Sequence, residues 1–345
     1  MKNLAEQKAA TGSIEGDPIE VMIRGRVYLS PMSGITDPPF RLLARRYGCP
    51  FAFTEMIDVN GLYYGNIKTL RMLEWTREDR PLGVQIVGQD EKKVMYAAEL
   101  CEDKGLSLID LNAGCPARKV VKAGKGAALL KDPVKFGRLV RKITKRVRVP
   151  VTVKIRSGWD GDNLNYMDVA RAVESSGAGA LCIHPRTQNQ MYRGRPDHDI
   201  AREIKDTVNI PVFASGNVFS AGDVREILDL TGCDAVAVAR GVFGRPWIFR
   251  EIQDYFHTGR ETGIYPSFDE IKRVIWEHTM LHLDFLEKER VFSRMYKHVC
   301  WYLKKYKNLN EVMKEYAGIK SVEDLRIFLD RLELENGRYL RLGKR

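Results

Sequence analysis

The residue with the clearest potential for chemistry is Cys115, in the run Leu111-Asn112-Ala113-Gly114-Cys115-Pro116. A thiol with an unperturbed pKa of about 8.5 is mostly protonated at neutral pH, so it can donate a proton as a general acid. The next segment carries four cations, Arg118, Lys119, Lys122 and Lys125. We expect these cations to lower the thiol pKa and to attract an anionic substrate. The alternative is a small buried cysteine of the core, which is the commoner fate of a free thiol.

Cys115 follows one of several short apolar runs that recur along the chain. There are eight of them, at residues 27–29, 51–53, 83–87, 108–111, 151–155, 180–183, 212–214 and 235–239. They are rich in β-branched residues and lack polar alternation, which is typical of parallel strands covered on both faces. Helix-like segments lie between them, at 91–103, 134–146, 167–176, 200–207 and 221–230. Eight β-α units predict a closed (β/α)8 barrel.

The competing fold is an open doubly wound sheet, which usually has fewer units and a G-x-G-x-x-G turn after its first strand. Here the first strand ends in Ser30-Pro31-Met32-Ser33-Gly34. Beyond residue 255 the strand pattern stops, and four helical segments follow at 269–289, 291–305, 309–317 and 321–332. We therefore expect a flexible extension over 1–20, a barrel over 21–258 and an all-helical domain over 259–345.

In such a barrel the working residues stand at the carboxyl ends of the strands. Gly-containing turns follow strands seven and eight, where barrels commonly bind a phosphate, and they contain Ser215, Gly216, Asn217, Arg240 and Gly241. A phosphorylated cofactor is therefore indicated. Other strand ends carry Pro31, Met32, Ser33, Gln85, Asn112, Lys154, Arg156, His184 and Arg186.

Lys154 together with Gln85 and His184 could bind the polar edge of an isoalloxazine and stabilise the negative charge of a reduced flavin. Taken alone, Lys154 could also be a surface lysine, and His184 a structural histidine. We find no Ser-His-Asp arrangement and no His/carboxylate cluster in the sequence, so hydrolytic and metal-dependent chemistry are disfavoured and no metal site is expected.

The charge of the chain points to a polyanionic partner. The formal net charge is +11 and the isoelectric point is about 9.3, which permits RNA, DNA or acidic membranes. Cations cluster in residues 131–148 and again in residues 288–307. In the second segment the cations, which include Lys297, alternate with aromatic residues. Such a mixture suits nucleic acid, although a charge run is also common on a solvated helix face. Neither a secretory signal nor an apolar stretch of 18 residues is present, so we expect a cytoplasmic protein with reduced cysteines.

The sequence from about residue 23 to about 332 resembles the tRNA-dihydrouridine synthases, and most closely the B-type bacterial members. The resemblance is carried by Ser30-Pro31-Met32-Ser33-Gly34-Ile35-Thr36-Asp37, Thr54-Glu55-Met56, Val84-Gln85-Ile86, Asn112 to Ala117, Val153-Lys154-Ile155-Arg156, His184-Pro185-Arg186-Thr187 and Gly241 to Phe249. It implies an FMN-containing barrel with a helical tRNA-binding domain. The implied enzyme reduces its flavin with NADPH, or NADH, and then reduces the C5=C6 bond of uridines in tRNA.

The resemblance also assigns roles to individual residues. Cys115 would protonate C5 of an extruded uridine after hydride transfer to C6. FMN would contact Pro31, Met32, Ser33, Gln85, Lys154 and His184, with its phosphate near Ser215, Gly216, Asn217, Ala239, Arg240 and Gly241. We expect the RNA substrate to meet Asn112, Arg118, Lys119, Arg156, Arg186 and Lys297, with Asn112 holding the uracil.

Two other functions fit parts of the sequence. A flavin barrel that reduces free pyrimidines, in the manner of dihydroorotate dehydrogenases, would share the cofactor site but not the basic helical domain. A non-catalytic RNA-binding barrel would share the charge but not the cofactor. We expect tRNA as the partner, no DNA or membrane binding, and a monomer.

Overall fold

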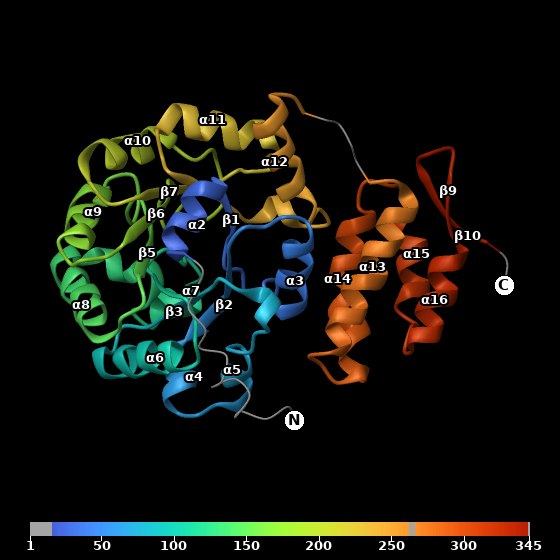
Figure 1. Cartoon of the computed structure of the whole chain (residues 1–345), viewed down its shortest axis with the longest axis horizontal. Coiled ribbons are helices and arrows are strands. Elements are labelled where there is room, and N and C mark those ends of the chain that lie inside the picture. The colour runs from blue at the N-terminus through green and yellow to red at the C-terminus, as the bar shows by residue number, and fades with distance from the viewer. Residues whose placement is uncertain (1–15, 262–265, 344–345) are drawn as a thin grey trace. The chain divides into compact units, whose positions relative to one another are not determined.

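The eight apolar runs form eight parallel strands that close into a barrel (Figure 1), counted within the residues that the computed structural model describes, 16–261 and 266–343. The strands are β1 (Val27–Leu29), β2 (Ala52–Asp58), β3 (Leu82–Val87), β4 (Leu108–Asn112), β5 (Val151–Arg156), β6 (Ala180–His184), β7 (Val212–Ser215) and β8 (Ala235–Val238). Each pairs with the next in sequence, and β8 pairs with β1. The predicted (β/α)8 barrel is confirmed.

Helices cover the outside of the barrel and alternate with the strands. The longer ones are α6 (Glu91–Asp103), α8 (Pro133–Arg146), α9 (Tyr166–Glu174), α10 (His198–Thr207) and α11 (Ala221–Thr231), and α3 (Pro38–Arg46) follows β1 along the chain. Shorter ones are α4 (Val59–Tyr63), α5 (Ile67–Arg71), α7 (Arg118–Lys122), η1 (Arg77–Asp79) and η2 (Gly126–Lys131). Side-chain caps start several of them; Asp90 accepts the Lys93 N–H at α6, and Asp132 accepts the Lys135 N–H at α8.

Aromatic side chains fill part of the barrel interior, as a packed barrel core requires. The Tyr28 ring meets Phe53 edge-on at 5.6 Å and Phe213 at 5.5 Å between centroids. The same hydrophobic cluster contains Ile19 and Met22 of α2 (Pro18–Gly25), along with the first residues of β4, β6 and β8. Because those residues start their strands, α2 closes the amino-terminal end of the barrel, and the opposite end is left for chemistry.

Helix α2 shows that the predicted flexible extension over residues 1–20 does not reach residue 20. Residues 1–15 lie outside the described residues. Asp17 caps the helix by accepting the Ile19 N–H at 2.9 Å, Pro18 occupies the first turn, and Ile19 is buried. Pro18 to Glu20 are therefore helical rather than flexible, because the apolar face of α2 packs into the barrel core.

The contacts divide the chain into two compact units, one of Met1–Arg41 and Cys49–Arg240 and the other of Leu42–Gly48 and Gly241–Arg345. The second unit contains η3 (Arg240–Val242) from Gly241 onward, α12 (Ile248–Thr258), α13 (Phe268–Leu283), α14 (Lys288–Leu303), α15 (Leu309–Tyr316) and α16 (Val322–Arg331). It ends in an antiparallel hairpin of β9 (Leu332–Glu335) and β10 (Tyr339–Leu342). The helical C-terminal region is as predicted, but the hairpin was not expected.

The second unit starts earlier than residue 259, because α12 and the loop before it share a core with α14. Trp247 and Tyr302 belong to one buried cluster and their rings stack at 6.4 Å. Gly244 has a φ of +68°, and a Cβ there would lie 2.1 Å from the carbonyl oxygen of Trp301. Only glycine allows this approach.

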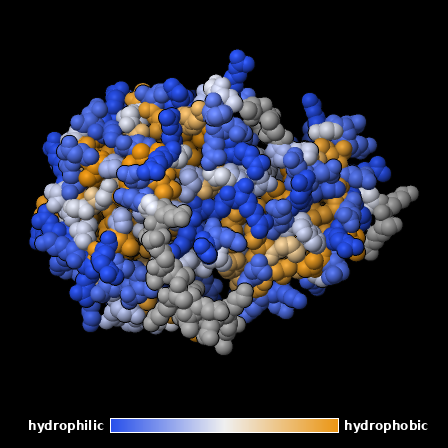
Figure 2. Space-filling model, viewed as in Figure 1, coloured by the Kyte–Doolittle hydropathy of each residue, from blue (hydrophilic) through white to orange (hydrophobic). Residues whose placement is uncertain are grey.

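The face of the molecule shown in Figure 2 is of mixed polarity. Hydrophilic residues dominate the face shown in Figure 2, with hydrophobic residues visible between them. None of the described helices is long and apolar enough to span a membrane.

Candidate active site at the carboxyl ends of the strands

The strand register brings the predicted site residues side by side. Asn112 of β4 pairs with Lys154 of β5, and Arg156 of β5 pairs with His184 of β6. Since all strands are parallel, these residues share the carboxyl end of the barrel. The structure thus gathers residues that are far apart in sequence into one neighbourhood.

A chain of buried hydrogen bonds crosses β3, β4 and β5. The Thr152 hydroxyl and the Gln85 amide each donate to the Asp110 carboxylate at 2.7 Å. The Asn112 amide in turn donates to Gln85 Oε1 at 2.8 Å. Burial raises the pKa of Asp110, against the hydrogen bonds that lower it. The network fixes the orientation of the Gln85 amide before any ligand binds.

Asn112 also shapes the loop that carries Cys115. Its Oδ1 accepts the Gly114 N–H at 3.1 Å and the Cys115 N–H at 2.8 Å. Arg156 Nε donates to the Gly114 carbonyl at 2.7 Å, and the Ala127 N–H donates to the Cys115 carbonyl at 3.1 Å. Hydrogen bonds therefore hold the backbone of Cys115 through both its N–H and its carbonyl group. The position from which the half-buried thiol extends is fixed.

The pKa of Cys115 moves in the opposite direction to our expectation from the sequence. Burial raises it, and this outweighs the hydrogen bond from the Ala117 backbone and the nearby Arg156 guanidinium, which both lower it. Of the cations expected to lower the pKa, Lys125 instead bonds the Asp58 carboxylate at 2.7 and 2.8 Å. Arg118, Lys119 and Lys122 are exposed on α7, where water screens their charge. The thiol is consequently held in its protonated form.

Lys154 delivers its ammonium group toward β6 and β7. Nζ donates to the Ser215 hydroxyl at 3.0 Å and lies 3.3 Å from Cys182 Sγ, which uses two of its three N–H groups. The Ser215 hydroxyl donates to the Ile183 carbonyl at 3.1 Å. The Ser215 hydroxyl is therefore engaged by both Lys154 and the backbone of β6.

His184 stands among cations and is neutral. Burial lowers its pKa below the usual range, and Arg156, Lys154, Arg186 and Arg240 lower it further. Arg186 Nη1 lies 3.0 Å from His184 Nε2. Because a guanidinium only donates, Nε2 accepts and the neutral ring carries its proton on Nδ1.

The turn after β7 draws two arginines together. Asn217, at a φ of +55°, accepts from Arg186 at 3.0 Å and from Arg240 at 3.2 Å through Oδ1. Gly216 has a φ of +123°, and a Cβ there would come within 3.2 Å of the His184 ring. The turn therefore places half-buried backbone beside positive charge, which suits an anion.

Arg156 and Tyr192 complete this end of the barrel. Arg156 is buried, with its guanidinium on the Thr187 and Met191 carbonyls at 2.9 and 2.7 Å, and burial lowers its pKa to about 10. Tyr192 is 55% exposed, and its ring centre lies 5.5 Å from the Arg156 guanidinium and 5.6 Å from that of Arg240. Tyr192 is not among the residues predicted from the sequence, where an aromatic residue in the long polar loop after β6 was the available signal.

The remaining predicted residues lie at several places. Pro31 and Met32 are half-buried and Ser33 is exposed after β1, where the Met32 N–H donates to the Thr36 hydroxyl at 3.0 Å. Ala239 precedes η3, and Gly241 is buried within η3. Arg118 and Lys119 are exposed on α7, and Lys297 is half-buried on α14.

The aromatic residues of 288–307 are used mainly for packing. Phe292 and Tyr302 are buried in the core of the second unit, and Trp301 stacks on Phe243 at 4.3 Å. Several cations of the segment are exposed, namely Lys288, Arg290, Lys304, Lys305 and Lys307. This segment therefore offers charge to a polyanion more than it offers stacking surfaces.

Comparison with known proteins agrees with this architecture. A family model described as dihydrouridine synthase (Dus) matches residues 28–335. The tRNA-dihydrouridine synthase B of Pseudomonas aeruginosa is 38% identical over 299 residues, which cover 86% of this chain and 90% of that protein. A probable tRNA-dihydrouridine synthase of Rhizobium leguminosarum is 37% identical over 311 residues, with 90% and 95% covered.

A solved structure, the histamine dehydrogenase of Rhizobium sp. 4-9, shares the fold alone. Its TM-score is 0.53 at 14% identity, and the match covers 74% of this chain and 49% of that one. The family model spans most of the chain, and the relatives match over most of their own length. The chain therefore belongs to the dihydrouridine synthase family.

Proposed function

We propose that this chain reduces uridines in tRNA to 5,6-dihydrouridine with FMN and NADPH, and that Cys115 is the proton donor. The observation that carries the proposal is a thiol kept protonated by burial, on a loop fixed by hydrogen bonds, at the strand end shared with Lys154, Arg156 and His184. The tRNA named for the relatives supports the substrate. An RNA substrate is also our reason to propose a cytoplasmic location, and the monomeric state stays a prediction.

The polar groups at this end of the barrel suit a flavin mononucleotide. Lys154, Arg186 and Arg240 place positive charge around a neutral His184, which favours a phosphate and a ring that gains negative charge on reduction. A side chain at residue 216 would press on the His184 ring, because its Cβ would lie 3.2 Å from that ring. The residues that would hold the cofactor are those predicted, namely Pro31, Met32, Ser33, Gln85, Lys154, His184, Ser215, Gly216, Asn217, Ala239, Arg240 and Gly241.

When bound, FMN supplies a hydride to C6 of the uracil, and NADPH replenishes it. The residues of this chain then have two tasks. Cys115 Sγ gives its proton to C5, and the resulting thiolate is stabilised by Arg156 and by the Ala117 N–H before solvent returns the proton. Lys154 and Gln85 orient the polar edge of the ring system through groups that are already fixed by hydrogen bonds.

Substrate binding would draw on the exposed cations. Arg118 and Lys119 lie only three and four residues after Cys115, so they suit the phosphates that flank an extruded uridine. Tyr192 offers an exposed ring for packing. Lys297 of α14 and the exposed cations of residues 288–307 would contact the RNA backbone elsewhere.

The test separates the two half-reactions of the purified flavoprotein. We expect Cys115→Ala to keep FMN and its reduction by NADPH, but to slow single-turnover dihydrouridine formation on unmodified tRNA by roughly 10²- to 10⁴-fold. Cys300→Ala is the matched control, because Cys300 is also half-buried and burial also raises its pKa. Full uridine reduction by the Cys115→Ala protein would refute the assigned role.

The substrate is tested with the same holoenzyme. Unmodified tRNA should oxidise the reduced flavin faster than uridine or uracil at equal nucleotide concentration. If the free pyrimidines react faster, the chain is an oxidoreductase of small molecules. A colourless protein that does not take up FMN would instead support a non-catalytic RNA-binding barrel.

A further inference from the structure

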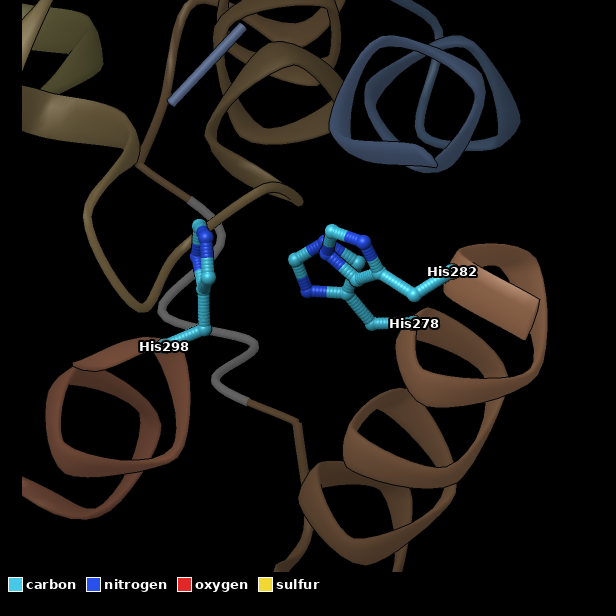
Figure 3. Close-up of side chains that lie close together, drawn as sticks. All are labelled: His278, His282 and His298. Atoms are coloured by element: carbon cyan, nitrogen blue, oxygen red, sulfur yellow. The ribbon is translucent and has the colours of Figure 1, made fainter. Parts of the chain in front are cut away.

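Three of the six histidines of the chain come together in the second unit. His278 and His282 lie four residues apart on α13, so they share one face of the helix, and His298 lies on the neighbouring α14. The three imidazole rings point toward one another between the two helices (Figure 3). We call these residues the histidine cluster. None of its three residues takes part in the proposed reaction.

The geometry of the histidine cluster is close to that of a metal site. One nitrogen from each ring lies within 4.8 Å of the other two. Ring centres are 4.9 Å apart for His278 and His282, and 4.6 Å for His278 and His298. In a tetrahedral zinc site with Zn–N bonds of about 2.0–2.1 Å, ligand nitrogens are about 3.3 Å apart. The ring centres of His282 and His298 are 6.2 Å apart, so the three nitrogens would have to move closer together to bind one ion.

The surroundings of the histidine cluster keep water away from the three rings. The side chains are 0–1% exposed, so the rings sit inside the core rather than on a wet surface. Neutral imidazole is the form that binds metals.

Tyr302 supplies the partner that metal-bound histidines commonly have. Its hydroxyl lies 3.0 Å from His278 Nδ1. A histidine that binds a metal through Nε2 carries its proton on Nδ1, and an oxygen at this place accepts that proton and fixes the ring. Arg294 and Lys297 act on the pKa of His278 as positive charges, so they would weaken the binding of a dication.

We propose that His278, His282 and His298 bind one Zn²⁺ ion that joins α13 to α14. Water would complete the tetrahedral coordination, since histidine nitrogens are the ligands that the cluster offers. Such an ion would stabilise the unit that carries the exposed cations of residues 288–307. This inference does not depend on the proposed function, because it concerns the second unit and not the reacting groups.

The test begins with untagged full-length flavoprotein freed of metal by a chelator. Titration with Zn²⁺ against a chromophoric chelator should show one bound equivalent per chain. Co²⁺ should give the intense visible bands of tetrahedral nitrogen coordination. An anomalous difference map at the zinc edge should show one peak between α13 and α14. A peak elsewhere, or none, overturns the proposal without any variant.

Variants then assign the ligands. His298→Gln should lower the Zn²⁺ affinity by more than roughly 100-fold, and Tyr302→Phe by roughly 10-fold, the range for a hydrogen-bond partner of a ligand. His257→Gln on α12 is the control, because His257 is exposed and outside the histidine cluster. Zinc should also raise the unfolding temperature of the wild-type and His257→Gln proteins but not of His298→Gln. Equal binding by all of these proteins would refute the site.

Discussion

Asn112→Ala tests whether the active-site loop is held by the residue that precedes it. The substitution removes the acceptor of two backbone N–H groups, those of Gly114 and Cys115, and the donor to Gln85. A buried N–H left without an acceptor costs roughly 1–3 kcal/mol. Allowing for relaxation of the loop, we expect a loss of about 2–4 kcal/mol, which is large against the 5–15 kcal/mol of a typical domain.

Two assays on the enzyme without RNA measure the loosening of the Cys115 loop. Thermal or denaturant unfolding should show the loss of stability, and alkylation by iodoacetamide should be faster at Cys115 because its loop is no longer fixed. In single turnovers with tRNA, a proton donor displaced by about 1 Å slows reduction by roughly 10²-fold. Reduction of the flavin by NADPH should be unchanged.

Asn66→Ala is the matched control, because Asn66 also caps a backbone N–H, that of Thr69 at 3.1 Å, but on the surface. It should cost only about 0.5–2 kcal/mol and leave the turnover rate unaltered. If Asn112→Ala slows uridine reduction while stability and alkylation of Cys115 stay as in the wild type, then Asn112 acts on the uracil alone. The positioning role would then be wrong.

Three further predictions follow from the same contacts. Gly126→Ala forces a side chain to within 2.7 Å of the Cys115 carbonyl at a φ of +60°, so it should cost roughly 1–3 kcal/mol and slow uridine reduction, whereas Gly161→Ala, in open space, should do neither. Because the acid must be protonated, uridine reduction should decline as pH rises through the raised pKa of Cys115; a single-turnover pH profile with no such decline would contradict this. Gly244→Ala and Gly259→Ala share a positive φ, but only the first meets the backbone of α14, at 2.1 Å, so calorimetry should show a much larger loss for Gly244.

The strands and the position of the site could be predicted from the sequence because they depend on local patterns. Apolar runs of β-branched residues separated by helical segments are sufficient for a barrel, and the barrel puts Cys115, Lys154 and His184 at strand ends. Helix α2 was not predicted because its apolar face is short. The helix forms because Ile19 and Met22 pack into the open end of the barrel.

The properties of the site groups depended on neighbours distant in sequence. Cations next to Cys115 in sequence suggested a lowered pKa, but Lys125 turns to Asp58, and burial raises the pKa of the thiol instead. The contact of Asn112 with uracil stays a prediction, whereas its role in holding the loop through Oδ1 appeared only in the structure.

The sequence by itself determined the barrel, the strand-end residues and the family motifs, since each is written in a local run of residues. Only the tertiary structure decided which groups are charged and which meet. His278 and His298 are separated by a helix end and a turn, and their contact exists only once α13 and α14 pack. Burial and electrostatic coupling are properties of three-dimensional surroundings, which spacing along the chain does not encode.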